Sequence, residues 1–160
     1  MTKIRVGFGF DVHQLKAGHP FVLGGVHLEH HSGAFGHSDA DVLLHAICDA
    51  LLGAANLRDI GFHFSNKDER WKGISSLVLL QKVVALLAEK SWTIGNIDAM
   101  VCLEEPKINP HIPDMKSHIA VAAGISEEDI SIKATTNEQL GFIGRQEGVV
   151  AYAVCLIEKL

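Results

Sequence analysis

The stretch Ile4-Arg5-Val6-Gly7-Phe8-Gly9-Phe10-Asp11-Val12-His13 alternates between apolar and other side chains with the two-residue period of a β-strand. The even positions carry only large apolar residues, which predicts a strand face packed in the core. The odd positions carry two glycines, which leave space for a close neighbour, followed by Asp11 and His13. Because alternate residues of a strand project to the same side, these two polar side chains can act as a pair.

A second pattern follows at His37-Ser38-Asp39-Ala40-Asp41-Val42-Leu43-Leu44-His45. Residues 42–56 have the 3.6-residue apolar period of a helix, and the serine and second aspartate of the pattern are spaced as in a capping box. His45 lies on this helix and can reach toward Asp11 and His13. Two imidazoles and one carboxylate, with a fourth position left for water or substrate, commonly hold catalytic zinc. The sequence therefore predicts a metal site formed by one strand and one helix.

The remaining periodicity predicts a single domain over residues 1–160. The further strands that we expect are 21–26 with a bend at Gly24-Gly25, 97–105, 130–134 and 148–158, and the further helices are 75–90 and 115–123; residues 27–36 are expected as a loop. This order of elements predicts an α/β (α+β) two-layer sandwich, in which helices cover one face of a mixed β-sheet. The last strand is apolar on both faces, so a helix layer with a neighbour, or an oligomer interface, must cover it.

The composition is typical of a soluble globular domain, with 160 residues, 48% of them hydrophobic and 21% charged. The 14 basic and 19 acidic side chains give a formal net charge of −5 without a basic cluster, which argues against nucleic acid as a partner. No apolar run reaches the roughly 18–20 residues that span a bilayer. The first residues run directly into the predicted strand, so no signal peptide is expected. Three cysteines without C-x-x-C spacing indicate a reducing compartment and small buried side chains.

Several polar residues allow a structural or a functional interpretation. Ser38 can cap the helix or, with His37, bind an anion at the helix N-terminus. Asp49, one helical turn after His45, can orient that imidazole or be a solvated helix residue. The segment 133–138 contains two threonine hydroxyls and a carboxylate, which can hold phosphate oxygens and a hard divalent cation, or form a turn with a helix cap.

Seven motifs occur in a fixed order: F-D-V-H (10–13), H-S-D-A-D-V-L-L-H-A (37–46), D-A-L-L-G-A (49–54), D-I-G (59–61), P-K-I-N-P-H-I-P (106–113), K-A-T-T-N-E (133–138) and L-G-F-I-G-R (140–145). In this combination they resemble the 2-C-methyl-D-erythritol 2,4-cyclodiphosphate synthase family from about Arg5 to the C-terminus. The resemblance implies an enzyme of the non-mevalonate isoprenoid route. Its substrate would be 4-diphosphocytidyl-2-C-methyl-D-erythritol 2-phosphate, whose 2-phosphate attacks the β-phosphorus, closes a cyclic diphosphate and expels CMP.

The resemblance also implies two metal ions. Zinc would be held by Asp11, His13 and His45, and magnesium or manganese by Glu138, while Asp49 would brace the zinc site from outside. A phosphate that attacks a phosphate must overcome charge repulsion, so the protein contributes mainly positioning and neutralisation. No nucleophilic side chain or strong general base is therefore expected.

The resemblance further implies where the substrate binds. His37 and Thr136 are the catalytic candidates through contacts with the phosphates, Asp59 and Gly61 would face the erythritol hydroxyls, and the loop that begins at Pro106 would bind cytidine. The complete set of substrate-binding residues that it implies is His37, Ser38, Asp59, Ile60, Gly61, Pro106, Lys107, Ile108, Asn109, Ala134, Thr135, Thr136, Phe142 and Arg145.

Relatives of this kind form homotrimers, so the resemblance implies active sites between subunits, with zinc ligands from one chain and the cytidine pocket from the next. Phe142, Arg145 and Glu147 would surround a central channel proposed to bind isoprenoid diphosphates; for Arg145 and Glu147 an intersubunit ion pair is the favoured role. The chain departs from the family at residues 64–68, where Phe-Ser-Asn-Lys-Asp replaces Phe-Pro-Asp-Thr-Asp in a loop bordering the pocket.

Two other functions are compatible with the metal pattern. A zinc-dependent phosphohydrolase would use the same residues to activate water. A trimeric metal-stabilised binding protein would use them without catalysis. The compartment expected for the synthase is the bacterial cytoplasm, or the plastid stroma after removal of a transit peptide.

Overall fold

The computed structural model describes residues 3–159. Its strands are β1 (Lys3–Ala17), β2 (Phe21–Leu23), β3 (Val26–Leu28), β4 (Ser32–Phe35), β5 (Thr93–Cys102), β6 (Ile130–Thr135) and β7 (Gly148–Lys159). Its α-helices are α1 (Val42–Ala54), α2 (Ile60–His63), α3 (Ser76–Glu89), α4 (Ile112–Ala123) and α5 (Gly141–Gly144). Single 3₁₀ turns occur at η1 (Glu69–Trp71), η2 (Asn109–His111) and η3 (Glu127–Asp129). None of the helices described is long and apolar enough to cross a membrane.

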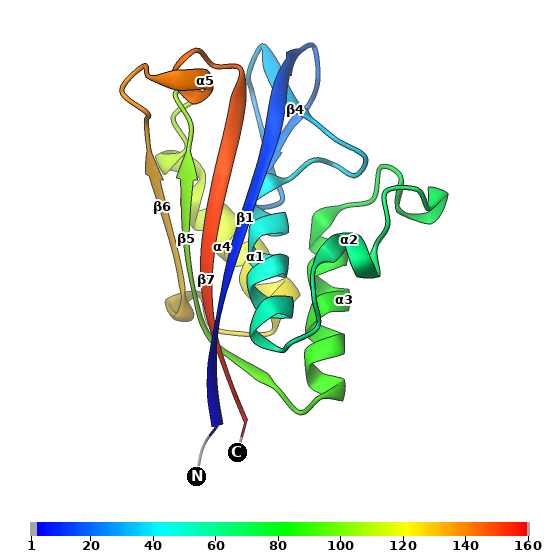
Figure 1. The fold of residues 1–160 in the computed structure, drawn as a ribbon. Helices are drawn as coiled ribbons and strands as arrows, with labels where there is room; N and C mark the ends of the chain where they lie inside the picture. The colour runs from blue at the N-terminus through cyan, green and yellow to red at the C-terminus, as the bar shows by residue number, and fades with distance from the viewer. Residues whose placement is uncertain (1–2, 160) are drawn as a thin grey trace.

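The main sheet has five strands in the order β4-β1-β7-β5-β6. Strands β5 and β6 are parallel, and every other neighbouring pair is antiparallel. Figure 1 shows α1 and α4 behind this sheet, with α1 next to β1 and β7, and α3 beside α1. The expected mixed sheet with helices on one face is therefore confirmed.

The two faces of β1 are the reverse of the expectation. Val6 and Phe8 belong to the apolar set that was expected in the core, yet they are 65% and 64% exposed in the single chain. The glycine side of the strand is the one that α1 covers, since a Cβ on Gly9 would lie only 1.9 Å from the Ala46 carbonyl oxygen. The glycines thus allow the helix to lie directly on the strand, on the face that also carries the predicted metal ligands.

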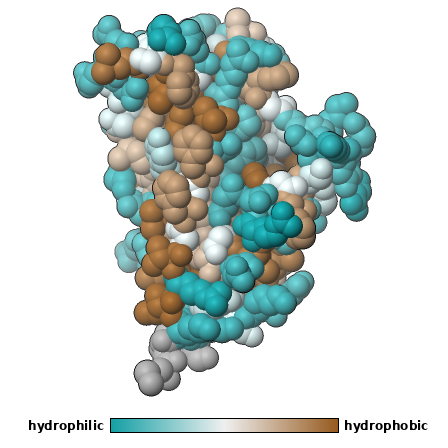
Figure 2. Space-filling view, viewed as in Figure 1, coloured by the Kyte–Doolittle hydropathy of each residue, from teal (hydrophilic) through white to brown (hydrophobic). Residues whose placement is uncertain are grey.

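The outer face of β1 and β7 carries an apolar strip, which we define as Val6, Phe8, Phe10, Tyr152 and Val154. Brown and tan atoms run along these two strands in Figure 2, and the rings of Phe10 and Tyr152 lie 5.3 Å apart. The inner face of β7 is buried against α1. The helix layer therefore covers one apolar face of the last strand, and nothing within the described chain covers the apolar strip.

Helix α1 is capped by Asp41 and not by the expected capping box that starts at Ser38. The Asp41 carboxylate accepts three backbone N–H groups, from Leu44 at 3.1 Å, Gly24 at 3.0 Å and Gly25 at 2.7 Å. Burial raises the pKa of Asp41, and the three N–H donors oppose this effect. Because the helix begins at Val42, His37 and Ser38 lie in the loop before it rather than at its N-terminus.

The segment around β1 also differs from the prediction. Residues 21–28 form a hairpin of β2 and β3 rather than one bent strand, because Gly24 and Gly25 both adopt positive φ and reverse the chain. Strand β4 lies inside the expected loop and pairs with the end of β1, where Gln14 is opposite Phe35. This pairing places the chain that leads to α1 beside the end of β1.

The elements of the second half lie close to their predicted positions. Helix α3 was expected over 75–90 and is capped by Ser75, and α4 ends at Gly124 in the left-handed conformation, where its end was expected. Strand β5 begins earlier and ends earlier than predicted, because its first residues pair with the end of β7. The short helices α2 and α5 were not predicted.

Candidate active site

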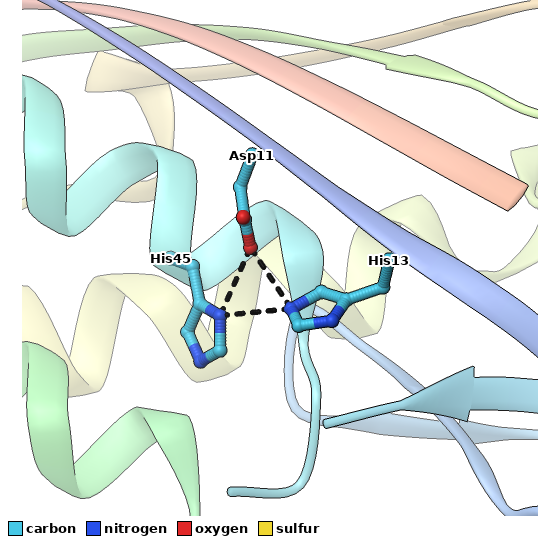
Figure 3. A group of neighbouring side chains, drawn as sticks. All are labelled: Asp11, His13 and His45. Atoms are coloured by element: carbon cyan, nitrogen blue, oxygen red, sulfur yellow. Dashed lines mark hydrogen bonds and ion pairs between the residues drawn. The ribbon is translucent and has the colours of Figure 1, made fainter. Parts of the chain in front are cut away.

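Asp11, His13 and His45 meet where α1 crosses β1. Strand β1 presents the first two on the face covered by the helix, and the first turn of α1 presents His45, so that all three side chains point toward one another in Figure 3. Asp11 Oδ2 lies 3.0 Å from His13 Nε2 and 3.0 Å from His45 Nδ1, and the two nitrogens are 3.2 Å apart. The structure thus brings the predicted ligand set together.

These three atoms have the chemistry and spacing of a metal site. Ligand atoms of a tetrahedral zinc ion lie about 3.3 Å from one another when each is about 2.0 Å from the metal. Burial raises the pKa of Asp11, but hydrogen bonds from His13 and His45 lower it to about 2, so the carboxylate is ionised at neutral pH. Burial lowers the pKa of His13, but Asp11, the Phe35 carbonyl and the charge of Asp41 together raise it, and the net shift is upward. The negative carboxylate therefore attracts a cation to this point.

The outer nitrogens of both imidazoles have partners that favour metal binding by the inner ones. His13 Nδ1 lies 3.1 Å from the Phe35 carbonyl oxygen, to which it can only donate, and this leaves Nε2 free of hydrogen. His45 Nε2 lies 3.1 Å from Ser38 Oγ and 2.9 Å from Ser76 Oγ. Neither the Phe35 carbonyl nor Ser76 was found from the sequence.

Asp49 does not make the contact with His45 that was expected. Its carboxylate accepts the Ile60 N–H at 2.8 Å, while the ring nitrogens of His45 have the partners given above. This hydrogen bond ties α1, which carries His45, to the first residue of α2. Burial raises the pKa of Asp49, with a further contribution from the charge of Asp59.

A cavity of about 680 Å³ opens beside the three side chains. Its polar part includes five residues that the sequence indicated for metal or substrate, namely His13, His37, Ser38, His45 and Gly61. Its apolar part includes Ile60, also indicated for substrate, and Phe64, which belongs to the loop expected to border the pocket. It also includes Phe35, Trp71, Ile74 and Leu79, which were not predicted. Asp59 caps α2 through the Phe62 N–H at 2.9 Å and is not among the lining residues. The cavity can therefore take a ligand with a charged and a less polar end.

The loop that departs from the family pattern forms part of this cavity. Phe64 and Asn66 line it, and Phe64 packs edge-on against Trp71 with ring centroids 5.2 Å apart. Asp68 accepts hydrogen bonds from the Arg70 guanidinium, and these lower the pKa of the Asp68 carboxyl. Of the substituted positions, Asn66 thus borders the ligand space, and none of them belongs to the metal-ligand group.

A smaller hollow of about 110 Å³ lies at the ends of β5 and β6. It is lined by Leu103 and by seven residues that the sequence indicated for cytidine and phosphate, namely Pro106, Lys107, Ile108, Asn109, Ala134, Thr135 and Thr136. The two predicted segments are adjacent because β5 and β6 are parallel and end together. None of the described residues lines both the hollow and the large cavity.

Glu138 lies in a turn next to this hollow. Thr136 donates a hydrogen bond to its carboxylate, with Oγ1 and Oε1 3.2 Å apart. The Glu104 carboxylate accepts the N–H groups of Asn137 at 2.8 Å and Gln139 at 3.2 Å. Glu138 and Gln139 both have positive φ, which is unfavourable for residues with a side chain. Glu104, not found from the sequence, therefore holds this turn in shape.

The intersubunit pairing of Arg145 with Glu147 stays a prediction, because the structure describes a single chain. The two side chains pair within one chain, with two N–O distances of 3.0 Å. Only one residue separates them, and the chain turns back into β7 at this point, so the guanidinium reaches its own neighbour. Phe142 in α5 remains 42% exposed.

Comparison with known proteins agrees with this fold and site. The model of the YgbB family matches residues 4–158. The 2-C-methyl-D-erythritol 2,4-cyclodiphosphate synthase of Cytophaga hutchinsonii is 64% identical over 157 residues, which cover 98% of this chain and 99% of the relative. The corresponding protein of Bacteroides thetaiotaomicron is 61% identical with the same coverage.

Solved structures give the same answer. The bifunctional IspDF of Campylobacter jejuni superposes with a TM-score of 0.96 at 38% identity over the whole of this chain, which spans 43% of that longer protein. The CDP complex of IspF from Plasmodium falciparum has a TM-score of 0.85 at 32% identity, covering 96% of this chain and 95% of the relative. The protein is thus an enzyme of the cyclodiphosphate synthase class. The chain belongs to the YgbB family, and the resemblance found in its motifs is confirmed.

Proposed function

We propose that the protein converts 4-diphosphocytidyl-2-C-methyl-D-erythritol 2-phosphate into 2-C-methyl-D-erythritol 2,4-cyclodiphosphate and CMP. An oxygen of the 2-phosphate forms a bond to the β-phosphorus, and the bond from that phosphorus to the α-phosphate oxygen breaks. The observation that carries the proposal is the Asp11–His13–His45 group beside a large cavity, in a chain with close relatives that bear the synthase name.

Zinc is the ion that we propose for these three side chains. A carboxylate oxygen and two imidazole nitrogens are donors that zinc accepts, and the outer partners of both rings fit that use. A zinc ion bound there would supply Lewis-acid stabilisation of the charge on the reacting phosphates. We assign Ser38 and His37 to the diphosphate, because both line the cavity next to the ligand group.

The erythritol part is assigned to residues 59–61. Ile60 and Gly61 line the cavity, and Asp49 fixes the start of α2 through the Ile60 N–H. The role of Asp49 is thus to hold the substrate-facing turn at a set distance from α1. Positioning of this kind is the main contribution a protein can make to transfer between two phosphates.

Cytidine and the α-phosphate are assigned to the hollow at the ends of β5 and β6. The loop 106–109 would hold the base and ribose, and Ala134, Thr135 and Thr136 the phosphate oxygens. Glu138 beside Thr136 would hold magnesium or manganese, which prefer oxygen ligands. The relative solved as a CDP complex supports a cytidine-linked ligand.

A homotrimer is the assembly that we propose. The apolar strip exposes five large side chains along two strands, more than an isolated soluble chain normally shows in one patch. The cavity is lined in part by Phe35 of β4, and the hollow by Ala134 and Thr135 of β6. Figure 1 shows these two strands at opposite edges of the sheet. One complete active site would then need the metal side of one chain and the nucleotide side of its neighbour. An isoprenoid diphosphate in a central channel would meet Phe142 and Arg145, although Glu147 already neutralises that arginine.

Product analysis tests the proposed reaction. After incubation with the cytidyl substrate, zinc and magnesium, phosphorus NMR should show CMP and the cyclic diphosphate in equal amounts. CMP with the open-chain 2-C-methyl-D-erythritol 2,4-bisphosphate, the product of attack by water on the β-phosphorus, would instead support the zinc phosphohydrolase. Absence of turnover would support the metal-stabilised binding protein. The variant His45→Ala should lose activity, while His27→Ala, which removes an exposed histidine of β3, should keep it. The bacterial relatives favour the cytoplasm as the place of this reaction.

A further inference from the structure

His45 is held at both ends of its imidazole ring. Nδ1 faces Asp11 and His13 at the proposed zinc position, and Nε2 faces two hydroxyl groups on the other side. An imidazole nitrogen that binds a metal carries no hydrogen, so the opposite nitrogen must carry it and donate it. Whichever group accepts from Nε2 therefore decides how firmly Nδ1 is presented to the metal.

Ser76 has the geometry of that acceptor. Its Oγ lies 2.9 Å from His45 Nε2, and the residue is completely buried at the start of α3. Its own proton goes to Asp39 Oδ1, and its backbone N–H donates to Asp39 Oδ2 at 2.8 Å. The serine oxygen thus keeps its lone pairs for the imidazole, and the carboxylate fixes both the position and the polarity of the hydroxyl.

Ser38 is the competing acceptor and is less suited to the role. Its Oγ lies 3.1 Å from His45 Nε2, already accepts the Ala40 N–H at 3.2 Å, and lines the large cavity. Its hydroxyl proton is therefore available to a ligand in the cavity. The two serines around one nitrogen have different surroundings, one buried against a carboxylate and one open to the ligand space.

We propose that Asp39 and Ser76 are positioning residues for the metal: they form a hydrogen-bonded chain from carboxylate to hydroxyl to His45 that orients Nδ1 toward the ion. This inference rests on the zinc site of the proposed function. Asp39 lies within the motif 37–45, and Ser76 lies in another helix, α3. The inference gives these two distant residues a shared role. Residues that orient a metal-bound histidine commonly change metal affinity by about 10- to 100-fold when they are replaced.

Zinc affinity is the direct test. Purified wild-type protein and the variants Ser76→Ala and Asp39→Asn are titrated with zinc against a chromophoric chelator. Both variants should bind zinc about 10- to 100-fold more weakly than the wild type. The hydroxyl and the backbone N–H of Ser76 both donate to the Asp39 carboxylate. Asn is nearly isosteric with Asp but replaces one of these acceptor oxygens with an NH₂ donor, so Asp39→Asn disturbs the polarity of the hydrogen-bonded chain with little change in volume.

Two serine variants serve as matched controls. Ser75→Ala removes a neighbouring hydroxyl that accepts the Leu77 N–H at the start of α3 and makes no contact with His45, so it should lower the melting temperature but leave zinc affinity within about twofold. Ser38→Ala should leave zinc affinity nearly unchanged and raise KM. A weaker zinc complex in Ser38→Ala than in Ser76→Ala would overturn the assignment of the acceptor.

A spectroscopic measurement separates orientation from general loss of structure. In the cobalt-substituted protein, the exchangeable proton on His45 Nε2 should give a shifted NMR signal that is protected from solvent. This signal should broaden or disappear in Ser76→Ala and persist in Ser75→Ala. If Ser76→Ala does not fold, Asp39→Asn decides by the same two measurements.

The outcomes distinguish this inference from the proposed function. Zinc binding by the wild type with unchanged affinity and NMR signal in both variants would overturn the positioning chain and leave the zinc site standing. Absence of zinc binding by the wild type, with no effect of His45→Ala on metal content, would overturn both.

Discussion

Replacement of Gly9 by alanine should separate α1 from β1 and disable the metal site. A Cβ at this position would lie 1.9 Å from the Ala46 carbonyl oxygen and 2.8 Å from the Ala50 backbone nitrogen. Both atoms belong to the helix backbone, so rotation of a side chain cannot relieve the overlap. Ala46 directly follows His45, and movement of the helix therefore moves that ligand.

The structure gives the size of the displacement. Carbon and carbonyl oxygen approach to about 3.3 Å without repulsion, so the helix or the strand must shift by about 1.4 Å. Overpacking of this kind costs about 3 kcal/mol of unfolding free energy. Metal ligands tolerate deviations of only about 0.2 Å, so zinc affinity should fall by about 100-fold or more, comparable with the effect of a 1 Å misplacement in an active site.

Urea unfolding and zinc competition titration together measure both effects. The matched control is Gly53→Ala in the same helix, where an added Cβ meets nothing within 4 Å. Because alanine is the better helix former by about 1 kcal/mol, Gly53→Ala should be as stable as the wild type or more so, with the same zinc affinity. If Gly9→Ala unfolds at the wild-type urea concentration and binds zinc within twofold of the wild type, the close approach does not position His45.

Three further predictions concern other parts of the chain. Glu138→Gln should reduce the stimulation of activity by magnesium or manganese by about tenfold. The zinc content, measured by atomic emission, should stay at about one ion per chain, and loss of zinc would contradict this division of roles. Phe8→Asp, at a position 64% exposed in the single chain, should give a folded protein of lower mass in light scattering than the wild-type assembly, and an unchanged mass would exclude the apolar strip as an interface. Burial raises the pKa of Cys155 to about 12 and that of Cys48 well above its ordinary value, so the thiolate fraction of both residues is small at pH 8 and rises with pH. A thiol reagent should therefore label neither residue in the native protein and both in urea. Rapid labelling of the native protein would contradict their burial.

The ligand set could be predicted because its geometry is local. The two-residue period of β1 places Asp11 and His13 on one side, and the helical period fixes where His45 emerges. The same period did not show which face of β1 is internal, since an apolar face looks alike whether it meets a helix or another subunit. The glycines of β1 were the better signal for its internal face. A glycine weakens a strand because it has no side chain to pack, so its presence indicates a neighbour that needs the space.

The partners of the ligands could not be predicted, because they come from distant segments. Ser76 lies 31 residues from His45, and Glu104 lies 33 residues from Asn137. Nothing in the local pattern of a serine beside a helix cap distinguishes a buried acceptor from a solvated hydroxyl. Asp49 was expected to turn toward His45 one helical turn away, but the Ile60 N–H lay within reach and had no helical partner.

The absence of any shared lining residue between the cavity and the hollow, within residues 3–159, has a consequence for mixtures of inactive chains. Consider a cyclic trimer in which each site combines two neighbouring chains. One kind of chain is defective on the metal side, and the other is defective on the nucleotide side. Every ring that contains both kinds has one junction made of two intact halves. Random co-assembly of equal amounts would restore about a quarter of the sites. Two alleles that are each lethal alone could then complement each other when both are expressed in one cell.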